Sequence, residues 1–246
     1  MEVHHHPDTE KKNFKGYLLE GLMIFIAVTM GFFAESIREN INDNHKEREY
    51  VNSLINNLEQ DRIFLNYCLS DNQKKIIGLD SLLSLSNKNM TYQGNKQLLY
   101  KYSQNCITFY SGFSSNDATM MQLKNSGGMQ YIKHDHVADS IAMYDQVVRS
   151  IYAAENPYSK AISDATDAMG ELLIFRVRAD TTYFKNNTYT NKDLPLLNSD
   201  YQKIEIFFNK ISLERGWTQN YVNNLQEKLP YTIRLIELLK KEYNYN

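Results

Sequence analysis

The side chains of this sequence that are best suited to metal chemistry are histidines, which occur in two groups. Residues 4–6 are three adjacent histidines, and His134 and His136 flank Asp135. Adjacent histidines can bind a metal ion, but residues 4–6 have no carboxylate or Cys at ligand spacing. Alternate positions of a helix point about 200° apart, so His134 and His136 do not readily share one ion. We therefore predict no metal site, and a solvated turn at residues 134–136.

Catalytic motifs are missing from the sequence. Ser126, Gly127 and Gly128 form a Gly-rich turn, but they lack the spaced glycines and the Lys-Ser/Thr pair of a phosphate-binding loop. Because Gly readily takes the left-handed conformation that ends helices, these three residues are predicted to break a helix. G-x-S-x-G, H-E-x-x-H and Cys-x-x-Cys are also missing. We therefore predict no cofactor and no enzymatic activity.

Two cysteines, Cys68 and Cys106, are available for redox chemistry. In an oxidising compartment they could form a disulfide, and the alternative is a pair of reduced, buried thiols. Their spacing does not distinguish these two states.

Tyrosines could line a ligand pocket, since the chain has 18 of them. Aromatic residues at helical spacing more often form a packed core, and we expect a core here. The candidates fall in the middle of the chain: Tyr100, Tyr102, Tyr110, Tyr131, Tyr144, Tyr152 and Tyr158.

The element that must position everything else is an apolar stretch near the amino terminus. Residues 21–34 contain no charge, and at 1.5 Å per residue they make a helix about 21 Å long. Residues 14–37 make about 36 Å, enough for a ~30 Å hydrocarbon layer if Glu20 and Glu35 lie near its two surfaces. We predict a transmembrane helix over residues 16–37.

Two other interpretations of this stretch are a buried helix of a soluble protein and a cleaved signal peptide. The stretch has no polar face, follows basic residues and shows no clear cleavage site, which favours an uncleaved span. Ala27 and Gly31 lie four residues apart, and such a pair of small residues lets two membrane helices approach closely.

Orientation follows from the positive charges beside the span. Within about twenty residues of its ends the two sides carry equal numbers of Lys and Arg, but the charges before the span lie closer to it. We therefore predict a cytoplasmic tail at residues 1–15 and a periplasmic domain after the span, in a bacterial inner membrane. The charges concerned are Lys11, Lys12 and Lys15 before the span and Arg38, Lys46 and Arg48 after it.

Composition favours helices for the rest of the chain. The sequence has only 10 Gly and 4 Pro in 246 residues, which argues against a turn-rich β protein. A net charge of −2 gives no sign of nucleic-acid binding. Residues 38–50 are mostly polar, and we predict that they form a helical stalk. We predict that residues 51–246 form a helical bundle.

Helical spacing of apolar residues predicts the elements of this bundle. The first helix continues from the stalk, and a loop is expected at residues 84–94. Further helices are expected at residues 96–106, at 117–125 with Asn116 or Ser115 as its cap, and from 135 onwards. The last of these has an apolar stripe at Val137, Ile141, Tyr144, Val148 and Ile151. A second apolar run begins at Tyr158 and includes Phe175, and Pro157 should kink or break the helix between the two runs. Residues 180–197 read as a surface excursion. A capping box at Ser199 and Gln202 should begin a helix that ends at Gly216, before a final helix at residues 217–243.

Two stretches carry a resemblance to a known family. Residues 11–61, KKNFKGYLLEGLMIFIAVTMGFFAESIRENINDNHKEREYVNSLINNLEQD, and residues 116–132, NDATMMQLKNSGGMQYI, contain its Tyr-Leu-Leu-Glu-like turn, its Lys-Glu-Arg-Glu-Tyr-like helix and its Leu-Lys-x-Ser-Gly segment. The sequence resembles a family of uncharacterised single-pass membrane proteins from Bacteroidota. The resemblance implies a membrane-anchored helical domain, and it assigns no activity to any residue.

Together these observations predict an all-α protein with one span, a stalk and an antiparallel bundle of about four long helices. The expected partners are the lipid bilayer and either a second copy or another envelope protein, with no nucleic acid. The leading functional hypothesis is a non-enzymatic envelope protein that associates through its bundle. The alternative is a ligand-sensing bundle that acts with a separate signalling subunit.

Overall fold

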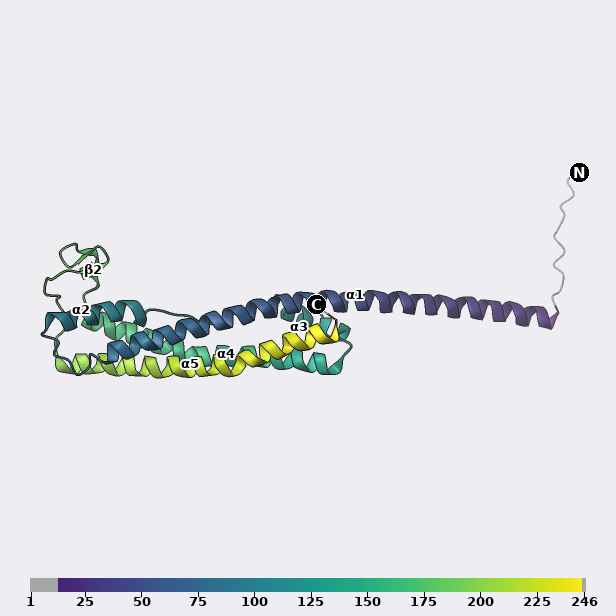
Figure 1. Cartoon of the computed structure of the whole chain (residues 1–246). Coiled ribbons are helices and arrows are strands. Elements are labelled where there is room, and N and C mark those ends of the chain that lie inside the picture. Colours follow the sequence, from purple (N-terminus) through teal and green to yellow (C-terminus); the bar gives the residue numbers. More distant parts are fainter. Residues whose placement is uncertain (1–12, 245–246) are drawn as a thin grey trace, which may run out of the picture. The chain divides into compact units, whose positions relative to one another are not determined.

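The computed structural model describes residues 13–244 and confirms the all-α class. Its chain divides into two units, Met1–Tyr50 and Val51–Asn246. The elements, labelled in Figure 1, follow in chain order: α1 Phe14–Leu83, α2 Gln93–Tyr102, the π-helical turn η1 Ser103–Ile107, α3 Ala118–Asn125, the 3-10 turn η2 Gly128–Tyr131, α4 Asp135–Leu172, the 3-10 turn η3 Phe175–Ala179, β1 Phe184–Lys185, β2 Thr188–Tyr189 and α5 Tyr201–Glu242.

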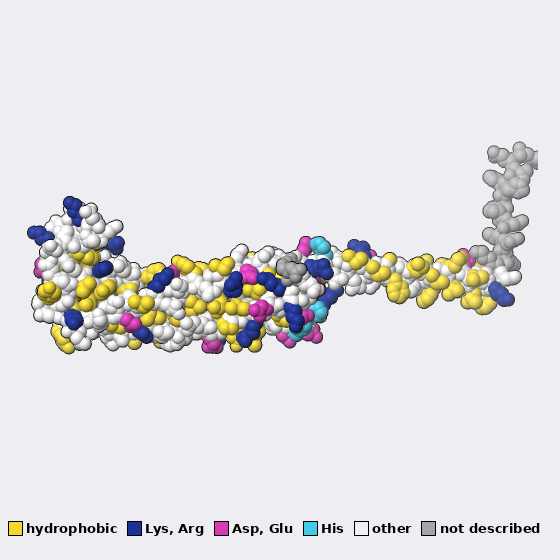
Figure 2. Space-filling view, viewed as in Figure 1, with side chains coloured by type: hydrophobic (Ala, Val, Ile, Leu, Met, Phe, Trp, Pro, Cys, Tyr) yellow, Lys and Arg dark blue, Asp and Glu magenta, His cyan; other side chains and the backbone are white. Residues whose placement is uncertain are grey.

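In the first unit, α1 contains a window that is long and apolar enough to cross a membrane, and none of that window is buried. A core helix of a soluble protein would be mostly buried, so this result favours a membrane span over a core helix. Figure 2 shows hydrophobic side chains covering this part of α1. The predicted tail residues 1–12, with their three histidines and with Lys11 and Lys12, lie outside the described residues.

The second unit is built on three long helices: the carboxyl-terminal part of α1, α4 and α5. Side-chain pairs define their directions. Asp61 and Asn72 of α1 bond to Tyr144 and Tyr158 of α4 in the same order along the chain, so these two helices run parallel. The α1–α5 ion pairs run in the opposite order, from Glu59–Lys240 to Asp80–Arg215, so α5 is antiparallel to α1.

The core forms where each long helix presents a row of buried side chains. On α1 this row alternates between spacings of four and three residues, the repeat that keeps one face of a helix directed at its neighbours. Its members are Leu54, Leu58, Asp61, Leu65, Cys68, Asn72, Lys75, Leu79 and Leu82. The stripe predicted for α4 is buried throughout, at Val137, Ile141, Tyr144, Val148 and Ile151. Phe175, which was predicted to continue the second α4 run, is instead 47% exposed.

One predicted helix break was wrong, and a second did not occur. Gly216 lies inside α5, which continues to Glu242. Pro157, where a kink or a break was predicted, lies inside α4, which continues without a break. Both helices are held on two sides by the bundle, and this packing outweighs the local cost of a helical Gly or Pro. The described chain therefore has three long helices, because one continuous α5 replaces two expected ones.

Two predicted helix starts also differ. Asp200 caps α5 by accepting a hydrogen bond from the backbone N of Gln202 at 2.8 Å, in place of the expected Ser199. Asp117 is the N-cap of α3 and makes no side-chain capping bond. Asn116 and Ser115, the expected caps, bond to α1 instead. The start of α5 is therefore fixed by a local cap, while the residues before α3 are held by tertiary contacts.

The excursion between α4 and α5 contains a small antiparallel hairpin, with Phe184 opposite Tyr189. Its turn residues Asn186 and Asn187 have φ of 52° and 58°, left-handed values that Asn tolerates better than most residues. Leu194 is fully buried and attaches the excursion to the core. Figure 1 shows the hairpin beside α2.

Candidate functional site

The most unusual feature of the bundle is an irregular segment, residues 109–117, that is held by side chains. It links η1 to α3 and has no regular secondary structure. Backbone groups inside a protein must find hydrogen-bond partners, and an irregular segment has no ladder to supply them. Here all three long helices supply them, through the buried polar side chains described next.

Lys75 of α1 satisfies the beginning of the segment. Its ammonium group donates to the carbonyl oxygens of Ile107 and Phe109. It also lies 2.8 Å from Oε1 of Glu214 on α5, with both side chains fully buried. Burial lowers the pKa of Lys75, and the nearby Glu214 carboxylate partly offsets this effect. Burial raises the pKa of Glu214 to about 7, against the opposing influence of Lys75.

Asn72 and two stacked tyrosines hold the middle of the segment. Asn72 Nδ2 donates to the carbonyl oxygen of Ser111 at 2.8 Å, and Tyr158 Oη donates to Asn72 Oδ1 at 2.7 Å. The backbone N of Phe113 donates to Tyr221 Oη at 2.8 Å. The rings of Tyr158 and Tyr221 stack with centroids 4.7 Å apart. Burial raises the pKa of Tyr158 to about 12, so its hydroxyl stays protonated at neutral pH.

Asp61 holds the end of the segment. Its carboxylate accepts from Ser115 Oγ, from the backbone N of Asn116 and from Tyr144 Oη, each at 2.6 Å. Only 2% of Asp61 is exposed. A cavity of about 160 Å³ adjoins this group. Asp61 therefore joins α1, α4 and the start of α3 at one point.

Cys68 and Cys106 are free and buried, so the two-thiol state is the one present. Cys68 Sγ contacts the carbonyl oxygen of Gly112 at 3.5 Å. Burial raises the pKa of Cys106 to about 12 and also raises that of Cys68. A thiol with a raised pKa is a poor nucleophile at neutral pH, so both cysteines have the character of core residues.

Most of the buried acids, amides and hydroxyls near the irregular segment hold its backbone, and Asp61 and Tyr144 also border the cavity of about 160 Å³. Catalysis needs a group that a substrate can reach.

The seven tyrosines singled out from the sequence were expected to lie in the core. Three of them, Tyr100, Tyr144 and Tyr158, are buried, whereas Tyr110 is 50% exposed. Among the described residues, no group of three or more His, Cys, Asp or Glu could hold a metal ion.

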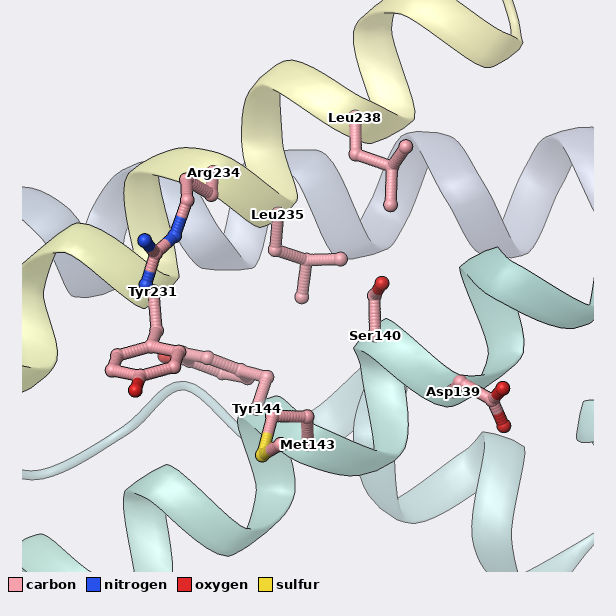
Figure 3. Close-up of a pocket in the computed structure, with 8 residues that line it drawn as sticks. All are labelled: Asp139, Ser140, Met143, Tyr144, Tyr231, Arg234, Leu235 and Leu238. Atoms are coloured by element: carbon pink, nitrogen blue, oxygen red, sulfur yellow. The ribbon is translucent and has the colours of Figure 1, made fainter.

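The clearest accessible concavity lies between α4 and α5, with a volume of about 510 Å³. Figure 3 shows Leu235 and Leu238 of α5 pointing toward α4, above Ser140. Arg234 lies over the ring of Tyr231 at one end of this groove, 4.5 Å from the ring centroid, and Asp139 lies at the other end. In the described part of the chain, neither Arg234 nor Asp139 forms an ion pair. The remaining lining residues are Met143 and Tyr144.

The residues singled out from sequence are spread over the chain. Ala27 and Gly31 are exposed on α1, and no side chain lies within 4 Å of a Cβ built on Gly31. Ser126 follows α3, Gly127 has φ of 70° and Gly128 begins η2. The ring centroids of His134 and His136 lie 5.7 Å apart, and His134 is the N-cap of α4 with an extended backbone, so it lies outside the helix.

Sequence reasoning missed Asp61, Asn72, Lys75 and Glu214, as well as the charges at the ends of the groove. One signal was present: on α1 the buried polar residues keep the four-and-three spacing of the leucines around them. Thr218 and Glu214 do the same on α5, where they continue the row of Phe207, Ile211 and Tyr221. Polar residues in register with an apolar row are therefore candidates for buried hydrogen-bonding positions.

Known proteins offer no guide to this arrangement. No family model, curated protein or solved structure matches the chain.

Proposed function

We propose that this chain is a non-enzymatic, membrane-anchored protein whose bundle associates with a second copy of itself. The observation that carries the proposal is the groove between α4 and α5, which combines an apolar interior with opposite charges at its two ends that form no ion pair with any described residue. The buried polar groups support the non-enzymatic part, because they are occupied in holding residues 109–117.

The groove has the chemistry of a self-complementary surface. Met143 is 50% exposed in the groove and Leu238 beside it is partly exposed, while Leu235, at 3% exposed, lies at its base. A two-fold axis that crosses the groove at right angles to its length places each end of the groove opposite the other end of the partner's groove. Asp139 of one copy would then face Arg234 of the other, twice in each dimer. Complementary charges of this kind set the register of an interface.

Membrane anchoring supports association by confining copies to a surface. Two modules held close together bind as if at a high effective concentration, so a modest interface is sufficient. Ala27 and Gly31 offer a second contact, since small residues four apart let membrane helices pack closely. The proposal therefore has two contacts between copies: bundle against bundle through the groove, and span against span through Ala27 and Gly31.

The proposed location is a bacterial inner membrane, with the amino terminus in the cytoplasm and the bundle in the periplasm. The basic residues close to the amino side of the span support this orientation, and the resemblance to the Bacteroidota membrane family supports the inner-membrane setting. External protease added to spheroplasts should digest the bundle. Its protection in intact spheroplasts, with digestion after lysis, would reverse the orientation.

A second candidate function is ligand sensing together with a separate signalling subunit. The buried tyrosines do not favour a tyrosine-lined pocket in the core. A different observation supports this candidate, namely a polar cavity of about 480 Å³ between α2 and the hairpin.

Cysteine crosslinking in native membranes tests the proposed association. Full-length Met143→Cys places a thiol in the groove, while Cys68 and Cys106 stay buried. A short bismaleimide should link Met143→Cys into dimers. The matched control, Asp167→Cys, places an exposed thiol on α4 outside the groove. Equal crosslinking of the two variants, or none of either, would contradict the proposal.

A further inference from the structure

A second cavity, unrelated to the groove, lies between α2 with η1 on one side and the hairpin on the other. Its volume is about 480 Å³, within the ~300–1,000 Å³ range of small-molecule sites. Lys101 and Asn105 line it from one side, and Arg178, Phe184 and Asn187 from the other. It lies entirely within the second unit of the chain.

The charges of this cavity have one sign. Lys101 and Arg178 line it, and no Asp or Glu does. Among the described residues, neither cation forms an ion pair. Residues 93–107, which form one wall, contain two lysines and no acid. Figure 2 shows Lys and Arg side chains around the hairpin end of the bundle. Two cations without counter-ions in one concavity attract an anion, and a guanidinium group matches a carboxylate in shape.

The neutral groups of the cavity suit hydroxyl groups. Carboxamides both donate and accept hydrogen bonds, as hydroxyls do. Gln104 Oε1 accepts from Tyr189 Oη at 2.7 Å, which leaves its Nε2 as a donor. Gln97 Nε2 donates to the carbonyl oxygen of Thr190 at 2.7 Å, which leaves its Oε1 as an acceptor. Phe184 adds an apolar surface, with Arg178 5.5 Å from its ring centroid.

The cavity is preformed because the excursion is fastened to α2 beside it. Tyr100 Oη donates to the carbonyl oxygen of Pro195 at 2.7 Å and accepts from the backbone N of Ile174 at 2.9 Å. Lys96 forms an ion pair with Asp193 at 2.8 Å. A site held in its binding geometry loses little conformational entropy when a ligand binds.

We propose that this cavity binds a sugar acid, with Arg178 and Lys101 on the carboxylate, the carboxamides on the hydroxyls and Phe184 against an apolar face of the ring. The proposal does not depend on self-association. A free sugar acid and the end of an acidic polysaccharide share this chemistry, and the experiment distinguishes them.

Isothermal titration of the full-length protein in detergent tests the site with D-glucuronate, D-glucose, inorganic phosphate and a short oligogalacturonate. Glucuronate should bind saturably and at least about 10-fold more tightly than glucose, which lacks the carboxylate and its charge-assisted hydrogen bonds. It should also bind at least about 10-fold more tightly than phosphate, which lacks the ring and the hydroxyls that Phe184 and the carboxamides would contact. Tighter binding of the oligomer than of glucuronate would identify a polysaccharide as the source, and the reverse a free sugar acid. Glucose or phosphate binding as tightly as glucuronate, or no saturable acid binding, would overturn the proposal.

Variants locate the binding on these residues. Arg178→Gln and Lys101→Gln should each weaken glucuronate binding about 10-fold or more. Arg176→Gln is the matched control, because Arg176 is an exposed cation of the same 3-10 turn that does not line the cavity. Equal weakening by Arg176→Gln and Arg178→Gln would show a diffuse charge effect and overturn the site.

Discussion

Lys75 and Glu214 form an ion pair in the interior of the bundle, with Nζ and Oε1 2.8 Å apart and neither side chain exposed. Transferring two charges from water costs more than their attraction alone returns, unless further hydrogen bonds are made. Lys75 makes these bonds to the carbonyl oxygens of Ile107 and Phe109. The pair therefore joins α1 to α5 and also supports a stretch of chain that has no secondary structure of its own.

The protonation of Glu214 should make stability depend on pH. Burial raises its pKa in the folded protein to about 7, from an ordinary value of 4.5. A carboxyl with a raised folded pKa contributes its full stability below the unfolded pKa and loses it as pH rises through the folded value. As the pH rises from 4.5 to 7, the melting temperature of the wild type should therefore fall relative to that of Glu214→Gln. Circular dichroism melts of both full-length proteins in detergent measure this difference, and parallel curves would contradict it.

Asp61 is expected to be the most sensitive single position of the polar network. Asp61→Ala removes the acceptor for Tyr144 Oη, Ser115 Oγ and the backbone N of Asn116 together. Leaving such donors unsatisfied should cost about 3 kcal/mol and lower the melting temperature by about 10 °C. Asp167→Ala removes an exposed carboxylate from α4 and should change it little. Similar losses for both variants would remove Asp61 from its proposed role.

Two helical glycines should respond oppositely to the same substitution. A Cβ on Gly216 meets nothing within 4 Å, so Gly216→Ala should stabilise α5 by about 0.5–1 kcal/mol. A Cβ on Gly78 would lie 2.9 Å from Cys106 Cβ, so Gly78→Ala must push α1 away from η1 at a cost of about 1–3 kcal/mol. Thermal melts of the two variants check both signs. A destabilising Gly216→Ala, or a neutral Gly78→Ala, would contradict this packing.

The sequence was sufficient for features that rest on local pattern. The length of the apolar stretch near Phe25 indicates a helix that is long and apolar enough to cross a membrane, and the structure has such a helix. The spacing of the row from Val137 to Ile151 indicates a buried helix face, and this row is buried. The helix start at Asp135 was also correct. In each case the physical cause lies within a few neighbouring residues.

The features that the sequence did not predict depend on contacts between segments that are distant in the chain. The burial of Lys75 requires Glu214 and the carbonyls that follow η1, and no neighbour of Lys75 in sequence signals either. Gly216 has a local preference for ending a helix, but α5 is held along its length by α1 and α4. The groove depends on how α4 and α5 face each other, so Asp139 and Arg234 look like ordinary surface charges in the sequence.

Charge reversal in the groove tests the central proposal, self-association through α4 and α5. In detergent, sedimentation of full-length Asp139→Arg or Arg234→Asp should show dimerisation weakened about 10-fold or more, because like charges then meet twice in the interface. Asp167→Arg and Lys241→Glu reverse exposed charges on the same two helices outside the groove, and they should leave dimerisation unchanged.

The double variant Asp139→Arg with Arg234→Asp is the most direct measurement, because it exchanges the two charges and restores their complementarity. The proposal predicts that this variant recovers the dimerisation lost in each single variant. A strictly monomeric wild type, or a double variant that dimerises no better than the singles, would contradict it.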